Sequence, residues 1–198
     1  TQASTTNWHT VQMWKELGAT RVVAAREVSL ADLKEMKDHV DIEIESFVHG
    51  SMCISYSGRC LLSNYMTGNR DANRGQCSQS CRWKYSLVES NRPGEYYPIE
   101  EDEHGTYIFN SKDLCLIHRI PDLYEAGIDS LKIEGRMKSV HYCATVAKVY
   151  RTAIDTYLKE GKDWYVRPEW IAELEKISHR PYTDGFAEGR PDETAQNY

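Results

Sequence analysis

The chain has 198 residues, of which 40% are hydrophobic and 27% charged, a composition that excludes a disordered tail and provides enough apolar residues for a core. No apolar run approaches the ~18 residues of a transmembrane helix. The net charge of −6 argues against a surface covered with nucleic-acid-binding residues, although it allows a local basic patch. Because no secretory signal is recognised, the six cysteines indicate metal binding or redox chemistry in the cytoplasm.

Hydrophobic periodicity predicts alternating helices and strands over the first 48 residues. A helix is expected over residues 7–17 and a strand over 21–25. Ser29 is a good N-cap for a second helix, which precedes a strand over 42–48. Strands and helices that alternate at this short spacing favour a parallel α/β sheet.

Residues 49–111 lack a long helical pattern and contain four of the six cysteines. Short strands are expected within this segment, over 84–88 and 106–109. A long irregular segment in a compact domain usually has a function or is held by something other than a core. We therefore expect a cysteine-rich insertion over 49–111.

Regular patterns return after residue 113, and four further elements are expected. The first is a helix over 114–126, in which Pro121 either introduces a kink or starts a second helix. A strand over 129–135 follows. The last two are a helix that is capped by Ser139 and runs to about Glu160, and a helix that starts at Pro168.

The expected strands are too few for a complete (β/α)8 barrel, which typically needs ~250 residues. The sequence therefore predicts an α/β fold that forms the second half of a (β/α)8 TIM-type barrel over residues 1–180. An open α/β sheet is the alternative. Residues 181–198 are rich in Gly, Pro and acidic residues and are expected to form a linker.

The spacing of the first four cysteines is C-x6-C-x16-C-x3-C. This spacing matches neither a zinc ribbon nor a bacterial ferredoxin, so it predicts a metal or cluster site without defining its type. Disulfides are disfavoured in a reducing compartment. Cys143 lies within an amphipathic helix, where a buried core position is favoured.

The segment from Glu45 to Ser63 reads ESFVHGSMCISYSGRCLLS and matches the motif E-x-F-x-x-G-[SA]-x-C-x4-G-x-C-x-x-S. By this motif the chain resembles peptidase family U32, the collagenase-like peptidase family. The resemblance continues through residues 70–77, 110–115 and 132–136, and it covers nearly the whole chain.

The family's catalytic domain is a (β/α) barrel, so the resemblance implies that the barrel begins upstream of Thr1. Gln2 would end the fifth strand, whereas Val22, Ile44 and Leu131 would lie on the sixth, seventh and eighth strands. The cysteine-rich insertion would then follow the seventh strand, and 181–198 would lead to a small C-terminal domain. The missing half of the barrel would come from an upstream segment, a partner chain or a swapped copy.

Well-studied members of the family resemble RNA or ubiquinone hydroxylases more than proteases, and they bind an iron–sulfur cluster through four cysteines. The resemblance implies such a cluster here, of the 4Fe-4S type, with zinc as the alternative occupant. The family spacing implies that its ligands are Cys53, Cys60, Cys77 and Cys115, with Cys81 as a competitor of Cys77.

Two further segments resemble one subgroup of the family. Tyr65-Met66-Thr67-Gly68 and Tyr96-Tyr97-Pro98-Ile99-Glu100 are similar to the proteins that take part in 5-hydroxylation of the wobble uridine of tRNA. In that subgroup the hydroxylation is linked to prephenate. The resemblance therefore implies tRNA and a prephenate-like dicarboxylate as partners.

The catalytic candidates are Glu45, His49 and Glu134. Catalytic groups of a (β/α) barrel lie at the carboxyl ends of its strands and in the loops after them, which brings His49 and Glu134 to one mouth, whereas Glu45 lies within a strand. His49 is the candidate for proton transfer because histidine titrates near neutral pH, although an orienting or purely hydrogen-bonded role is left open. Glu45 would be a buried acid that needs a partner. Lys132 and Glu134 share one face of a strand and form either a structural or a catalytic pair.

Several basic residues are candidates for substrate binding. Arg26 and Arg136, together with Lys132, suit a dicarboxylate because a guanidinium group can donate two hydrogen bonds to one carboxylate. Arg26 could instead cap the helix that follows it.

Arg70 and Arg74 lie in a locally basic segment. The segment from Gly50 to Val88 contains five basic residues and one acidic residue, so its charge is +4 within a chain of net charge −6. Aromatic residues are interleaved with the basic ones. Basic and aromatic side chains together suit an unstacked nucleotide. The alternative is that these arginines hydrogen-bond the loop or neutralise thiolates.

The sequence thus favours iron–sulfur-dependent, prephenate-linked hydroxylation of a tRNA uridine. The first alternative is a collagenase-like peptidase with a peptide substrate, which would require a thiolate beside a histidine, such as Cys53 beside His49. Neither H-E-x-x-H nor G-x-S-x-G occurs in the chain. The second alternative is a non-catalytic scaffold that binds RNA or a partner chain.

Overall fold

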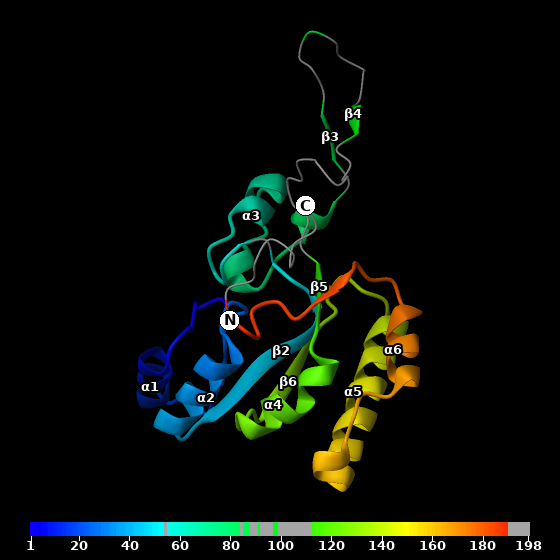
Figure 1. Cartoon of the computed structure of the whole chain (residues 1–198). Helices are drawn as coiled ribbons and strands as arrows, with labels where there is room; N and C mark the ends of the chain where they lie inside the picture. The colour runs from blue at the N-terminus through cyan, green and yellow to red at the C-terminus, as the bar shows by residue number, and fades with distance from the viewer. Residues whose placement is uncertain (54, 84, 88–90, 92–96, 99–111, 190–198) are drawn as a thin grey trace.

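The computed structural model describes residues 1–53, 55–83, 85–87, 91, 97–98 and 112–189, and these form a mixed α/β fold (Figure 1). Five of the described strands form one sheet, and two short strands form a separate antiparallel pair, β3 (Ser86–Leu87) with β4 (Tyr97–Pro98). The strands of the main sheet are β1 (Arg21–Val23), β2 (Glu43–Ser51), β5 (Asp113–Cys115), β6 (Ser130–Glu134) and β7 (Tyr182–Thr183).

Helices follow or precede most of these strands. The α-helices are α1 (Trp8–Glu16), α2 (Leu30–His39), α3 (Leu62–Thr67), α4 (Ile120–Glu125), α5 (Val140–Glu160) and α6 (Pro168–Glu175). Short 3-10 helices are η1 (Ala72–Arg74), η2 (Ser80–Arg82), η3 (Ile117–Arg119) and η4 (Gly161–Asp163). In the described part of the chain, no helix combines the length and apolar character that a membrane crossing requires.

Strand β2 is the centre of the sheet. β1 pairs with its first residues in parallel, so that Val22 lies opposite Ile44, and β6 pairs in parallel along its other edge. β5 pairs with residues 49–51 of β2 in the antiparallel direction, and β7 runs parallel to β5. At residues 49–50 of β2, one edge of the strand is already paired with β6. β5 therefore lies on the other edge, the one that pairs with β1 at residues 43–45.

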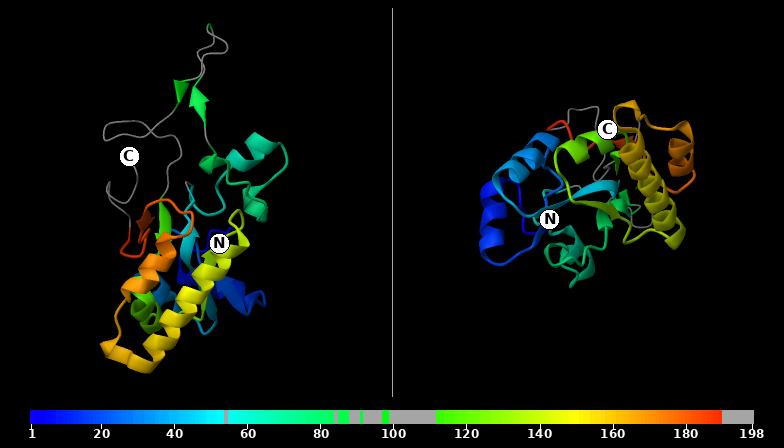
Figure 2. Two further views of the ribbon diagram at one scale, coloured as in Figure 1. Left: turned by 90° about the vertical axis from the view of Figure 1, so that its right-hand side faces the viewer. Right: turned by 90° about the horizontal axis from the view of Figure 1, so that it is seen from below.

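Helices α1, α2, α4, α5 and α6 form an arc around one face of the sheet when the molecule is viewed from below, and α3 lies outside this arc (Figure 2). One hydrophobic cluster joins α1 and α2 to β1 and β2, with Met36 and Ile44 fully buried. A second cluster joins β2 and β5 to α5 and α6, with Val48 and Leu174 fully buried. Together these clusters fix the sheet on its helical side, which leaves the other face available for a site.

Both predicted helix caps are confirmed. The hydroxyl of Ser29 accepts a hydrogen bond from the Asp32 N–H at 3.1 Å, and the Asp32 carboxylate accepts one from the Ser29 N–H at 3.1 Å. The hydroxyl of Ser139 accepts a hydrogen bond from the Tyr142 N–H at 3.1 Å. Each cap satisfies backbone donors that the first helical turn leaves unpaired.

The helix predicted over 114–126 is wrong in its first part. Residues 113–115 form β5, and the α-helix starts only at Ile120, with Pro121 in its first turn. The reason is that a short continuous apolar run fits a strand buried on both faces as well as a helix. Here the exposed edge of β2 provides a strand partner, and the pairing makes the sheet mixed rather than purely parallel.

The α/β class and the three adjacent parallel strands β1, β2 and β6 are confirmed. The described strands do not close into a barrel, so the half-barrel is not confirmed. The predicted core position of Cys143 is wrong, because its side chain is exposed and the buried stripe of α5 runs through Val146, Val149 and Ala153 instead. The expected linker starts with β7, and the strand predicted over 106–109 lies outside the described residues.

Gly50 allows β2 and β6 to approach each other at their carboxyl ends. Its φ is +107°, and a Cβ atom at this position would lie 2.1 Å from the carbonyl oxygen of Glu134. We expect Gly50→Ala to lower the free energy of unfolding by about 3 kcal/mol or more, because strain and a backbone clash add. Urea unfolding followed by circular dichroism measures this loss.

Gly68→Ala is the matched control for this experiment. Gly68 also has a positive φ of +78°, but a Cβ atom there meets nothing within 4 Å. We expect a loss of about 1 kcal/mol, which is the cost of the backbone conformation alone. Equal losses for the two variants would contradict the close approach of β2 to β6.

Candidate functional site

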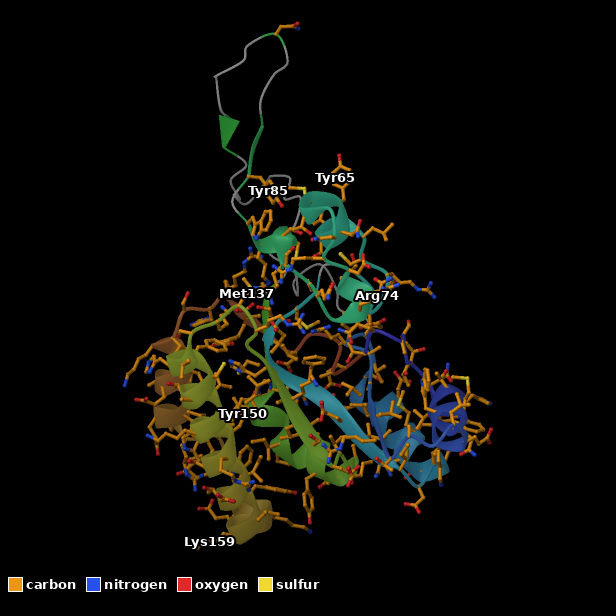
Figure 3. The ribbon with its side chains drawn as sticks, turned by 180° about the vertical axis from the view of Figure 1, so that it is seen from behind. Tyr65, Arg74, Tyr85, Met137, Tyr150 and Lys159 are labelled. Atoms are coloured by element: carbon orange, nitrogen blue, oxygen red, sulfur yellow. The ribbon has the colours of Figure 1, made fainter. Side chains whose placement is uncertain are left out.

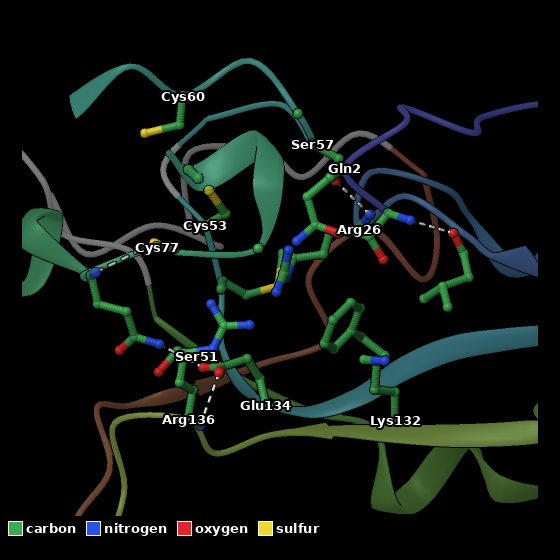
Figure 4. Close-up of a pocket in the computed structure, with 18 of the residues that line it drawn as sticks. Gln2, Arg26, Ser51, Cys53, Ser57, Cys60, Cys77, Lys132, Glu134 and Arg136 are labelled. Carbon is green, nitrogen blue, oxygen red and sulfur yellow. Dashed lines mark hydrogen bonds between the residues drawn. The ribbon is translucent and has the colours of Figure 1, made fainter. Parts of the chain in front are cut away.

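A cavity of about 380 Å³ lies at the carboxyl ends of β1, β2 and β6. One wall is made by the segment that follows β2 and carries Cys53, Cys60 and Cys77 (Figure 4). The opposite wall is made by Lys132, Glu134 and Arg136, which lie on β6 or directly after it. The cavity therefore brings thiols, basic groups and one carboxylate together from distant parts of the sequence.

Four thiols line this cavity, and they belong to Cys53, Cys60, Cys77 and Cys81. Burial raises the pKa of the Cys53 thiol, and it raises the pKa of the Cys81 thiol to about 11. Among the described residues no three histidine, cysteine or acidic side chains are arranged to hold a metal ion. In its chemistry, a set of four thiols is of the kind that thiolate-binding metals and clusters use.

Cys115 does not line the cavity. It lies in β5, and only 6% of its surface is exposed. Burial raises the pKa of its thiol, which interacts with the Tyr150 hydroxyl. The structure therefore gathers Cys81 with the other three loop cysteines and separates Cys115 from them.

Arg26 enters the cavity from the loop after β1. Its guanidinium group stacks on the Phe47 ring, with 4.0 Å between the guanidinium carbon and the ring centroid. Burial lowers the pKa of Arg26, and the nearby thiols of Cys53 and Cys77 oppose this shift. Among the described residues, neither Arg26 nor Arg136 forms an ion pair with a carboxylate, so both guanidinium groups can bind an anion.

The loop that carries Cys53 and Cys60 is anchored to the segment after β1. Ser57 donates hydrogen bonds to the Glu27 carboxylate from its N–H at 3.1 Å and from its hydroxyl at 2.9 Å. The Ser57 hydroxyl also accepts a hydrogen bond from the Arg26 N–H at 3.2 Å. These bonds fix the position of the loop relative to the guanidinium group of Arg26, which faces it.

The carboxylate of Glu134 is held from two sides. One oxygen accepts a hydrogen bond from the side-chain amide of Gln79 at 2.7 Å. The other accepts a hydrogen bond from the Arg136 N–H at 3.0 Å. Of the three predicted catalytic residues, Glu134 is the one that lines the cavity.

Glu45 lies behind the cavity and pairs with Lys132, whose ammonium group is 2.7 Å from it. Burial alone would raise the pKa of the Glu45 carboxyl, but the hydrogen bonds from Lys132 and Ser130 outweigh burial and lower this pKa. Glu45 therefore stays ionised and orients Lys132, which itself lines the cavity.

His49 lies on the helical side of the sheet. It is fully buried, and its ring contacts Tyr142, Tyr150 and Tyr182. The reason is a bulge in β2: Phe47 lies opposite Lys132 and His49 lies opposite Ile133, so one extra residue rotates His49 away from the cavity. Its ring does not line the cavity with the thiols, so a Cys53–His49 nucleophile pair has no support from this position.

Arg70 and Arg74 have different environments. Arg70 donates hydrogen bonds to the carbonyl oxygens of Gln76 and Cys77, so it holds the cysteine loop. Arg74 has a side chain that is 82% exposed and lies 3.7 Å from Asp71. Tyr65, at 83% exposure, projects from α3 on the same part of the molecule (Figure 3).

Sequence reasoning gave no role to Gln79, which lines the cavity, or to Asp113, which lies beside it, and it counted Arg82 only among the basic residues of the loop. Arg82 donates a hydrogen bond to the buried Asp113 carboxylate at 2.6 Å and another to the Met52 carbonyl at 3.1 Å. Asp113 could have been found, because an acidic residue at the start of an apolar run needs a buried partner. No sequence pattern marks Gln79.

The fold and the cavity define an α/β protein with a cysteine-lined site at the carboxyl ends of its parallel strands. The sequence profile of peptidase family U32 matches residues 1–197. The chain belongs to peptidase family U32, which confirms the resemblance found in the sequence.

Curated relatives of the chain have names that refer to RNA. It is 52% identical over 191 residues to tRNA hydroxylation protein P1 of Bacillus subtilis, covering 96% of this chain and 45% of that protein. It is 41% identical over 237 residues to tRNA hydroxylation protein P of Escherichia coli, covering 100% and 51%. It is 35% identical over 181 residues to the 23S rRNA 5-hydroxycytidine C2501 synthase of Escherichia coli, covering 88% and 26%.

The chain spans about half the length of the first two relatives. No solved structure matches the chain.

The burial of His49 predicts a pH-dependent stability. Burial lowers the pKa of His49 from 6.5 to about 4 in the folded state, so the unfolded state binds the extra proton first as the pH falls. His49 should therefore cost no stability above pH 6.5 and progressively more between pH 6.5 and 4, up to about 3 kcal/mol. Urea unfolding across this pH range measures the loss.

His49→Gln isolates this contribution from that of the carboxyl groups. The variant should be less stable than the wild type at pH 7, but its stability should fall by about 3 kcal/mol less between pH 6.5 and 4. Parallel pH curves for the two proteins would show that His49 is not held in its neutral form.

Proposed function

We propose that the protein containing this chain hydroxylates RNA, with the wobble uridine of tRNA as its substrate. The observation that carries the proposal is the single cavity in which four thiols face Arg26, Lys132, Arg136 and Glu134. The names of the relatives support RNA hydroxylation as the activity. A tRNA substrate also agrees with the cytoplasmic location expected from the sequence. For the fold, we keep the half-barrel as a proposal, with which the parallel strands β1, β2 and β6 agree.

The thiols are proposed to hold an iron–sulfur cluster of the 4Fe-4S type, which would supply one-electron chemistry, with zinc as the alternative occupant. The family spacing implies Cys115 as the fourth ligand. The position of Cys81 on the cavity supports Cys81 in that role, because Cys115 is buried in β5 beside Tyr150. We therefore propose the ligand set Cys53, Cys60, Cys77 and Cys81.

The basic wall of the cavity is proposed to bind a prephenate-like dicarboxylate. Arg26 and Arg136 have no carboxylate partner among the described residues, and each can donate two hydrogen bonds to one carboxylate. Lys132 adds a third positive charge, whose direction is fixed by Glu45. A dianion placed between these groups would lie beside the thiol wall.

Glu134 is proposed as the group that moves a proton during the reaction. Its two hydrogen bonds fix the carboxylate at the end of β6, where it faces the cavity. Glu45 positions Lys132 instead of reaching the substrate, and His49 contributes to the core. This assignment keeps all groups that contact substrate on one face of the sheet.

The exposed surface around α3 is proposed to contact tRNA. Tyr65 and Tyr56 are 83% and 66% exposed, and Arg74 lies on the same segment. Exposed aromatic rings can stack on unpaired bases, while arginine contacts phosphate groups. Arg70 would stabilise this surface, because its hydrogen bonds to the carbonyl oxygens of Gln76 and Cys77 hold the loop.

Complementation of a deletion strain tests the function. The full-length protein should restore 5-hydroxylated uridine at the tRNA wobble position, measured by nucleoside mass spectrometry, whereas Arg26→Gln should restore about tenfold less because a charge-assisted contact is lost. Arg151→Gln is the control, since Arg151 pairs with Asp155 on the exposed face of α5. Absence of hydroxylation with the wild-type protein would refute the proposal.

A pair of cysteine variants tests the ligand set. Cys81→Ser should lose most of the iron and sulfide found after anaerobic purification of the full-length protein, because a hydroxyl group is a poor cluster ligand. Cys115→Ser should retain both, and the exposed Cys143 provides a third variant, Cys143→Ser, as a control. The reverse result for Cys81 and Cys115 would restore the ligand set implied by family spacing.

A further inference from the structure

Gln79 has a backbone conformation that is unusual for a residue with a side chain. Its φ and ψ are 54° and 35°, in the left-handed region. Among the described residues, one other non-glycine residue, Ser4, has a positive φ. Glycine adopts this conformation without strain, so a glutamine here is less stable than a glycine unless its side chain contributes something else.

The two neighbours of Gln79 are held by hydrogen bonds. The N–H of Ser78 donates a hydrogen bond to the Ser63 hydroxyl at 2.9 Å, and the Tyr85 hydroxyl donates one to the Ser80 carbonyl at 2.6 Å. Both serines are buried. The chain is thus held on both sides of Gln79, which lines the cavity and whose side-chain amide reaches Glu134.

Gln79 makes two hydrogen bonds that connect the two walls of the cavity. Its N–H donates to the Cys77 sulfur at 3.3 Å, on the thiol wall. Its side-chain amide donates to the Glu134 carboxylate at 2.7 Å, on the opposite wall. One strained residue thus sets the position of both a thiol and the carboxylate that faces it, and strain of this kind concentrates at functional sites.

We propose that Gln79 is a positioning residue for Glu134: its amide fixes the direction of the carboxylate that moves a proton in the reaction. This inference rests on the proposed function. Gln79 does not itself contact the substrate. The backbone N–H, and not the side chain, supports Cys77, so the two roles can be separated by substitution.

Gln79→Gly removes the amide and keeps the backbone N–H. In the full-length protein we expect an unchanged or higher Tm, because glycine relieves the left-handed strain, and unchanged iron and sulfide content. The complementation assay should show a loss of about tenfold or more in tRNA hydroxylation, since a hydrogen bond to a charged group is missing.

Ser4→Gly is the matched control, because Ser4 has the same φ of 54° outside the cavity lining. It should also leave Tm unchanged or raise it, but hydroxylation should remain at the wild-type level. A loss of hydroxylation in this control equal to that of Gln79→Gly would overturn the inference, because strain relief alone would then explain both.

A double-mutant cycle with Glu134→Gln completes the test. If Gln79 acts through Glu134, the double variant should be no less active than Glu134→Gln alone. Full activity of Gln79→Gly beside an inactive Glu134→Gln would overturn the inference and leave the proposed function intact. A lower Tm with loss of iron in Gln79→Gly would also overturn it, since Gln79 would then be merely structural. An inactive wild-type protein would refute both.

Discussion

The buried carboxylate of Asp113 is the constraint on which the cavity depends. It has no exposed surface, and it accepts hydrogen bonds from Arg82 and from the N–H of Arg180, with Lys138 at 3.7 Å. A charge removed from water in this way is tolerated only when it is paired and hydrogen-bonded. The segments that carry the partners of Asp113 are therefore held together, because removing one partner would leave a buried charge unpaired.

The cysteine loop is one of these segments. Arg82 directly follows Cys81, and its second hydrogen bond goes to the carbonyl of Met52, which directly precedes Cys53. The first and last thiols of the loop are consequently fixed to the same point at the end of the sheet. Since Lys132 and Glu134 come from β6 of that sheet, the ion pair between Arg82 and Asp113 connects the thiol wall of the cavity to the sheet that carries the opposite wall.

Local signals in the sequence were sufficient for the capped helices α2 and α5, for the parallel strands and for the gathering of loop cysteines near Glu134. They were insufficient where partners far apart in sequence decide the outcome. The apolar run from Leu114 becomes a strand because an edge of β2 is free beside it. Likewise, a two-residue period assigns Phe47 and His49 to one face, whereas a bulge separates them.

That bulge has a consequence for the kinds of change the protein can accept. Phe47, before the bulge, contacts Arg26 on the cavity side of the strand, whereas His49, after it, packs against buried tyrosines on the helical side. Deleting or inserting one residue between Phe47 and Cys53 would exchange these two environments for every later side chain in the strand. The length of this segment is therefore under tighter physical control than the identity of most of its residues.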